Sequence, residues 1–232
     1  MALISRAVED RLRRSFERIN RWGERLPAEQ QRLLRRADSR RELARRSYID
    51  SYWRVRETSP LILAAIHTFN VRQDFYSARF WGQHFAEELG HDAVQYRDIV
   101  NIYGSQRKTS AVLAERGISP PSAAILAYFH WQVTQGDPHL LMVYRLFLEL
   151  FMVEMPAHTE FFRNMLGKSA TRTVTLHREA DAKHVKGCRR YIDRSFRAEH
   201  LRTLLWTVDF ICDRLIESQL WILDGIHVEA QP

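Results

Sequence analysis

Apolar residues recur every three to five positions along most of the chain, which is the spacing of one face of an α-helix. Near the N-terminus the repeat runs through Leu3, Ala7, Leu12, Phe16 and Ile19. No stretch alternates apolar and polar residues with β-branched enrichment over the length of a strand. The pattern therefore predicts an all-α protein.

Glycine and proline mark the ends of the predicted helices. Pro60 suits the first turn of a helix that continues to Tyr103, and Gly104 ends it. A long apolar helix is expected over about 139–166, with Pro156 as the place for a kink. Further helices are expected over about 3–22, 27–53, 122–134, 171–194 and 198–226. The result is a bundle of seven or eight helices.

Composition narrows the class of protein. At 232 residues, with 45% apolar and 27% charged residues, the chain has the make-up of a folded domain with its own core. The two cysteines, Cys188 and Cys212, are too few for a disulfide framework and favour a reducing compartment. The sequence shows neither an apolar run long enough for a bilayer nor a secretory signal. We therefore expect a soluble, cytoplasmic protein without a membrane partner.

The net charge of +7 comes from the first quarter of the chain, because residues 1–60 hold 16 arginines and 9 acidic residues. A nucleic-acid site is one interpretation of such a cluster. The arginines alternate with Glu17, Glu24, Glu29 and Glu42 at helical spacing, however, which is typical of a solvated helix face. Nucleic acid is therefore not an expected partner.

Two short segments combine histidine with carboxylate at helical spacing. His84, Glu88 and His91 fall at i, i+4 and i+7, which would place all three on one stripe of a helix. Glu-x-x-His is the spacing that directs a carboxylate and an imidazole to one ion. The second segment repeats the spacing with His177, Asp181 and His184. A solvated face explains one such stripe alone, but two on separate helices favour a metal site.

A carboxylate in the apolar segment 142–153 is the third candidate. Glu149 must be paired, metal-bound or protonated if it faces the interior, because burying it alone is costly. Glu154 lies about 140° around the helix from Glu149, so the two would not share a site. Mixed imidazole and carboxylate ligands suit iron or manganese better than zinc or calcium. The candidate metal ligands are His84, Glu88, His91, Glu149, His177, Asp181 and His184.

At these residues the chain resembles the haem-oxygenase-like diiron oxidase and oxygenase superfamily, whose relatives include TenA-like and PqqC-like proteins. The resemblance rests on His84-x6-His91, on the apolar segment from Pro138 to Glu149, and on His-x3-Asp-x2-His at 177–184. It implies a haem-oxygenase-like bundle of about seven helices over residues 58–232. Residues 1–57 would form an Arg-rich helical N-terminal extension. The chain departs from the family at His84, where members have glutamate.

The resemblance also implies a function. Two non-haem iron ions, with manganese as the alternative metal, would be held by the seven candidate ligands. They would use dioxygen to oxidise a small amino-acid-like or fatty-acid-like substrate. It favours Glu149 over Glu154 as ligand. No catalytic residue is expected beyond the metal ligands.

Other readings of the same residues stay open. A ferritin-like diiron bundle would leave His177 unexplained. A metal-free TenA-like hydrolase needs a cysteine nucleophile, and neither cysteine has an obvious base beside it in sequence. A small-molecule-binding or partner protein of the same fold is the third alternative, and a homodimer is compatible with each reading.

Overall fold

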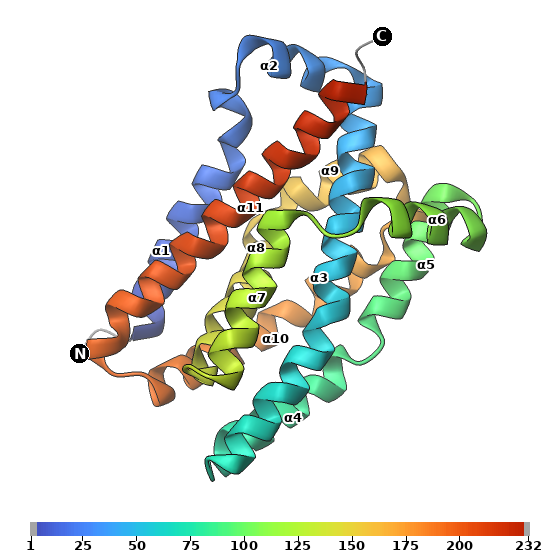
Figure 1. The fold of residues 1–232 in the computed structure, drawn as a ribbon. Coiled ribbons are helices and arrows are strands. Elements are labelled where there is room, and N and C mark those ends of the chain that lie inside the picture. Colours follow the sequence, from blue (N-terminus) through green and yellow to red (C-terminus); the bar gives the residue numbers. More distant parts are fainter. Residues whose placement is uncertain (1–3, 230–232) are drawn as a thin grey trace.

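The protein is a bundle of α-helices (Figure 1). The computed structural model describes residues 4–229, except the side chains of residues 177–182 and 227–229. In that part of the chain all regular structure is helical, which confirms the predicted all-α class. The α-helices are α1 (Ile4–Asn20), α2 (Ala28–Arg35), α3 (Ala37–Val71), α4 (Phe75–Glu88), α5 (His91–Tyr103), α6 (Gln106–Arg116), α7 (Pro120–Thr134), α8 (Leu141–Glu154), α9 (Pro156–Leu166), α10 (Arg172–Ser195) and α11 (Leu201–Glu229). Short 3-10 turns link several of them, at Trp22–Arg25, Pro138–Leu140, Lys168–Ala170 and Ala198–His200.

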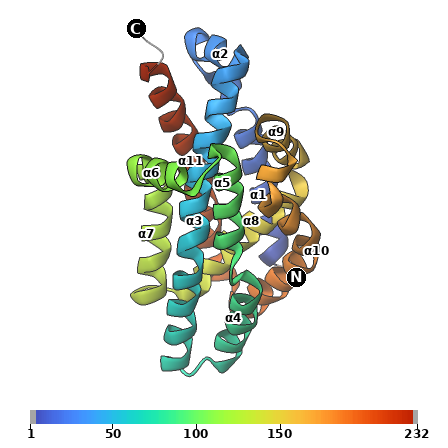
Figure 2. The same ribbon diagram turned by 90° about the vertical axis from the view of Figure 1, so that its right-hand side faces the viewer.

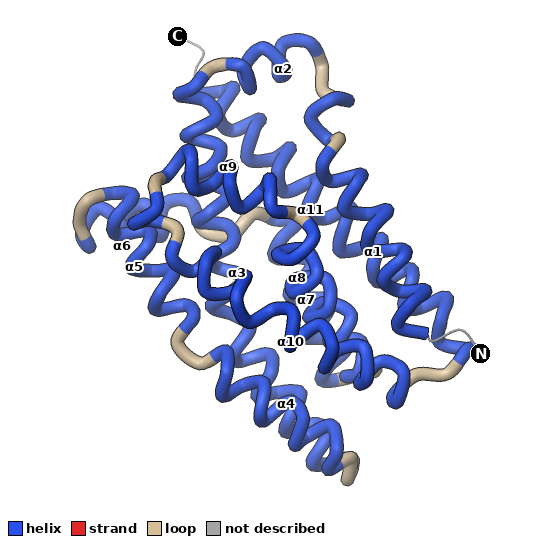
Figure 3. The backbone as a smooth tube through the Cα atoms, turned by 180° about the vertical axis from the view of Figure 1, so that it is seen from behind, coloured by secondary structure: helices blue, strands red, loops and turns tan. Residues whose placement is uncertain are grey.

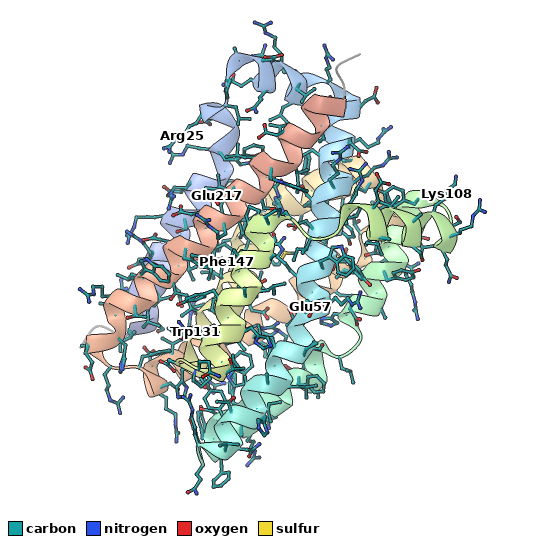
Figure 4. All side chains as sticks on the ribbon, in the orientation of Figure 1. Arg25, Glu57, Lys108, Trp131, Phe147 and Glu217 are labelled. Atoms are coloured by element: carbon teal, nitrogen blue, oxygen red, sulfur yellow. The ribbon has the colours of Figure 1, made fainter. Side chains whose placement is uncertain are left out.

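The core lies between α3, α7, α8, α10 and α11. Helix α8 packs on α10 on the side of the bundle that faces away in Figure 1 and toward the viewer in Figure 3. Helix α3 packs on α4 and α7. Helices α3 and α4 extend together beyond one end of the bundle (Figure 2). Trp81, Phe129, Phe147 and Tyr191 are among the largest buried side chains of this core, and Figure 4 shows Phe147 in the interior. Of the helices described, none is both long and apolar enough to cross a lipid bilayer.

The N-terminal helix packs into this core. Val8, Leu12 and Phe16 of α1 are buried, and the Phe16 ring meets the Phe147 ring of α8 edge-on at a centroid distance of 5.3 Å. Glu9 of α1 also pairs with Arg189 of α10. Helix α3 runs unbroken across residues 57 and 58, where the sequence suggested that an extension ends and the bundle begins.

Pro60 does not begin a helix, contrary to expectation, but lies inside α3. A proline within a helix removes one hydrogen bond, to the carbonyl of the residue four positions earlier, here Arg56. Both residues are exposed, so water can satisfy that carbonyl. The helix therefore continues to Val71.

The expected helix from Pro60 to Tyr103 is instead three helices. Asp74 caps α4 by accepting a hydrogen bond from the Ser77 amide at 3.0 Å. Gly90, at φ = 93°, separates α4 from α5, in a left-handed conformation that glycine adopts without steric cost. His91 is thus the first residue of α5, and the prediction that it shares one continuous helical stripe with residues 84 and 88 is wrong. Pro156 likewise ends α8 and begins α9 rather than kinking one helix.

Candidate metal centre

Side chains from α4, α5, α8 and α10 converge in the interior of the bundle. His84 and Glu88 come from α4 and Glu149 from α8, and each is at most 6% exposed. One possible ligand atom from each of these three residues lies within 4.8 Å of the other two. The structure therefore brings together three of the seven predicted ligands as a buried cluster of one imidazole and two carboxylates.

The imidazole of His84 offers an open nitrogen to this cluster. Its Nε2 atom is buried and has no hydrogen-bond partner within the described part of the chain. Burial, together with the charge of Arg145, lowers the pKa of His84 to about 3. The ring is therefore neutral at neutral pH, which is the form that binds metal ions.

Glu88 is held in place from the neighbouring helix. The Nδ1 atom of His91 lies 3.0 Å from Glu88 Oε2, across the bend at Gly90. His91 is more exposed than Glu88, with 24% against 5% of its side chain accessible. A histidine contact of this kind fixes the orientation of a ligating carboxylate.

The two acidic residues of α8 have different environments. Glu149 is 2% exposed and lies in the cluster, whereas Glu154 lies near the surface and forms an ion pair with Arg13 of α1 at 3.1 Å. The structure therefore places Glu149, the carboxylate favoured by the resemblance, beside His84 and Glu88.

Of the second predicted stripe, the structure describes only the side chain of His184. Its Nδ1 atom lies 3.3 Å from the Glu149 carboxylate, and its Nε2 atom lies 3.2 Å from Glu87 Oε2. The hydrogen bond with Glu149 raises the pKa of His184. The side chains of His177 and Asp181, on the same helix, lie outside the described residues.

Arg145 lies at the centre of the cluster and is not among the ligands predicted from the sequence. Its Nη2 atom is 2.8 Å from Glu88 Oε1 and 3.1 Å from His184 Nδ1, and it also pairs with Glu149 one helical turn away. Burial disfavours the charged guanidinium, but Glu149 and Glu88 outweigh burial, so the pKa of Arg145 is raised. The signal was present in the sequence as the one basic residue four positions before the buried carboxylate.

The donor set fits a divalent transition metal. His84 Nε2, which makes no hydrogen bond to a described residue, and the two carboxylates supply the nitrogen and oxygen ligands that iron and manganese prefer. Glu87, another residue not predicted from the sequence, lies at the edge of the cluster and contacts His184. The chemistry of the described donors is thus compatible with the metal that the resemblance implies.

A cavity of about 490 Å³ adjoins the cluster, and Glu88, Arg145 and Glu149 form part of its wall. Its lining along α3 reaches from Arg40 to Thr58, a distance of about 27 Å along the helix axis. Most of the wall is apolar and aromatic, including Leu43, Val55, Phe147, Leu148, Phe151, Met152, Phe161 and Phe162. The cavity therefore suits an elongated, mostly apolar molecule.

Arg54 and His158 add polar groups to that apolar wall. The Arg54 side chain is 15% exposed, and its Nε atom is buried without a hydrogen-bond partner among the described residues. Its closest carboxylate, on Asp50, is 3.8 Å away and already accepts three hydrogen bonds. Burial lowers the pKa of His158 to about 4, so this ring carries no charge at neutral pH. Arg54 thus gives the cavity a cation with spare hydrogen-bonding capacity.

Comparison with known proteins identifies the architecture. No protein-family model matches the chain, and no curated protein matches it in sequence. Among solved structures, the chain is similar to a domain of unknown function with a heme oxygenase-like fold from Shewanella denitrificans. The two share 18% sequence identity at a TM-score of 0.62, over 82% of this chain and 79% of the other. The protein therefore has a haem-oxygenase-like fold, as the sequence resemblance implied.

Proposed function

We propose that this protein is a non-haem iron oxidoreductase that uses dioxygen to oxidise a small organic substrate. The observation that carries the proposal is the buried cluster of His84, Glu88 and Glu149 at the wall of an apolar cavity. His84 Nε2 would bind the metal together with oxygens of the two carboxylates. In the diiron form that the sequence resemblance implies, the remaining predicted ligands would complete the centre, with manganese as the alternative metal.

The metal, the cavity wall and Arg54 would have different roles in the reaction. When bound, iron would supply the one-electron chemistry with dioxygen that protein side chains lack. The aromatic and aliphatic wall of the cavity, which includes Phe147 and Phe151, would exclude water and hold the apolar part of the substrate against the cluster. Arg54 would bind an anionic group of the substrate by charge-assisted hydrogen bonds.

Changing His84 to alanine tests the metal site. We expect the wild-type protein to bind Fe²⁺ or Mn²⁺ under anaerobic conditions and His84→Ala to bind it at least about 100-fold more weakly, because even outer contacts to metal ligands contribute 10- to 100-fold. Calorimetric titration with Mn²⁺ measures the affinity. His130→Ala, an exposed histidine on α7, is the matched control and should bind as the wild type does. Equal Mn²⁺ affinity in His84→Ala and wild type would refute the site.

Changing Arg54 to glutamine tests the substrate class. We expect decanoate to bind the wild type and Arg54→Gln to bind it about 10- to 100-fold more weakly, since a hydrogen bond to a charged group contributes about 1.5–3 kcal/mol. Calorimetry with decanoate, and with decylamine as the cationic counterpart, measures this preference. Arg56→Gln is the control, because Arg56 is an exposed neighbour that lies over the Trp53 ring. If decylamine binds to the wild type with the same affinity as decanoate, the proposed preference for anions is wrong.

A metal-free binding protein of the same fold is the second candidate, and the position of Arg145 favours it. A guanidinium that pairs with both Glu88 and Glu149 supplies positive charge to the cluster without a metal. Decanoate binding by a wild-type protein that takes up no metal would select this alternative. A cysteine-dependent hydrolase has less support, because Cys188 and Cys212 are buried and neither lines the cavity. Burial also raises the pKa of the Cys212 thiol to about 11, which keeps it protonated.

A further inference from the structure

We propose that Arg145 takes one of the two metal positions of the haem-oxygenase-like diiron pattern, so that this chain binds a single metal ion. The inference rests on the proposed function, because it assumes that His84, Glu88 and Glu149 bind a metal. It differs from the two-ion centre that the resemblance implies.

The geometry at one atom carries the inference. Three potential ligands meet at Nη2 of Arg145, namely Glu88 Oε1 at 2.8 Å, His184 Nδ1 at 3.1 Å and the paired carboxylate of Glu149. A carboxylate from α4, a carboxylate from α8 and an imidazole from α10 around one point are the donors expected of a metal ion held between helices. In this chain a guanidinium nitrogen occupies that point.

The guanidinium is held there firmly. Arg145 is 5% exposed, and arginine stays protonated in proteins, so it cannot leave the site by losing its charge. Swinging the side chain away would leave a buried cation without its two carboxylate partners, which is strongly unfavourable. An incoming second ion would therefore compete with a cation that already pairs with two buried carboxylates.

One metal position is still available beside Arg145. His84 Nε2 makes no hydrogen bond to any described residue and is not among the three groups that contact Arg145 Nη2. One possible ligand atom from each of His84, Glu88 and Glu149 lies within 4.8 Å of the other two, so these groups are close enough to share one ion. A first ion thus has an imidazole ligand that does not contact Arg145 Nη2, whereas a second divalent ion would face both the guanidinium and the first ion.

Replacing Arg145 with neutral methionine separates these cases. We expect the wild type to bind one Mn²⁺ per chain in anaerobic titration with elemental analysis, Arg145→Met to bind two, and Arg145→Lys, which keeps the positive charge, to bind one. Electron paramagnetic resonance supplies a second readout that does not depend on activity. The wild type should give the spectrum of isolated Mn²⁺ ions, and Arg145→Met should give one broadened by coupling between two ions. Arg189→Met, which removes the half-exposed arginine paired with Glu9, is the control and should stay at one ion.

The number of Mn²⁺ ions bound per chain tests the inference. Two ions in the wild type, or one ion in both wild type and Arg145→Met, would overturn this inference and leave the metal-dependent function standing. No Mn²⁺ uptake by any variant would overturn both. Should Arg145→Met fail to fold, Arg145→Gln, which is neutral but still donates hydrogen bonds to the carboxylates, gives the same contrast.

Discussion

Replacing Glu149 with leucine is expected to abolish metal binding and to lower the free energy of unfolding by about 3 kcal/mol. Glu149 is 2% exposed, shares the buried Arg145 with Glu88, and also contacts His184 of α10. Breaking a buried ion pair by removing one member costs about 3–5 kcal/mol, because the other charge remains buried. The lower end applies because Glu88 still pairs with Arg145.

Thermal melts and Mn²⁺ titration of the same samples measure both effects. For a chain of this length, about 3 kcal/mol corresponds to a fall in Tm of about 6–12 °C. Glu154→Gln is a stringent control, because Glu154 lies on the same helix, five residues later, and pairs with half-exposed Arg13. Its Tm should change by little, since exposed ion pairs contribute at most about 1 kcal/mol. Mn²⁺ affinity that survives in Glu149→Leu but falls in Glu154→Gln would mean that the wrong carboxylate has been assigned.

The helical class and about half of the helix ends could be predicted from the sequence because they depend on local chemistry. The 3.6-residue repeat is strong, and Gly104 and Pro138 act on their own neighbours. The breaks near Asp74 and Gly90 were missed because apolar periodicity continues across them. A single glycine in a helical pattern is ambiguous until packing shows whether the chain turns there.

The site was predictable in its donors but not in its balance of charge. Spacing pointed to His84, Glu88 and Glu149, which the structure brings together although the helix carrying the first two ends at Glu88. The spacing of four residues between Arg145 and Glu149 was a signal for their ion pair, but the contact of Arg145 with Glu88 joins residues far apart in sequence and could not be inferred from spacing. The cavity could not be predicted from the sequence either. Its wall comes from several helices, and the apolar residues of those helices have the same pattern as core residues.

Another buried carboxylate, that of Asp50, joins three helices by hydrogen bonds. Its Oδ1 accepts a hydrogen bond from the Ser119 amide at 2.9 Å, and its Oδ2 accepts from the hydroxyls of Ser122 at 2.6 Å and Ser218 at 3.0 Å. These contacts tie α3 to the N-terminus of α7 and to α11. By accepting from the Ser119 amide, the carboxylate also provides a hydrogen-bond acceptor at the start of α7, where backbone amides lack partners within the helix.

Changing Asp50 to alanine is therefore expected to cost about 4 kcal/mol of folding free energy, because three donors lose their acceptor and each buried donor left unsatisfied costs about 1–3 kcal/mol. Tm should fall by about 8–16 °C, and Asp50→Asn, which keeps one acceptor oxygen, should lose less. Asp224→Ala is the control, since this exposed carboxylate accepts a hydrogen bond from Gln30 on the surface. The change also reaches the cavity, because Asp50 is the carboxylate beside Arg54. In Asp50→Asn, decanoate should therefore bind more tightly than to the wild type, as Arg54 loses its competing anion. If Asp50→Ala lowers the free energy of unfolding no more than Asp224→Ala does, the three serines have other hydrogen-bond acceptors and the assigned role of Asp50 is wrong.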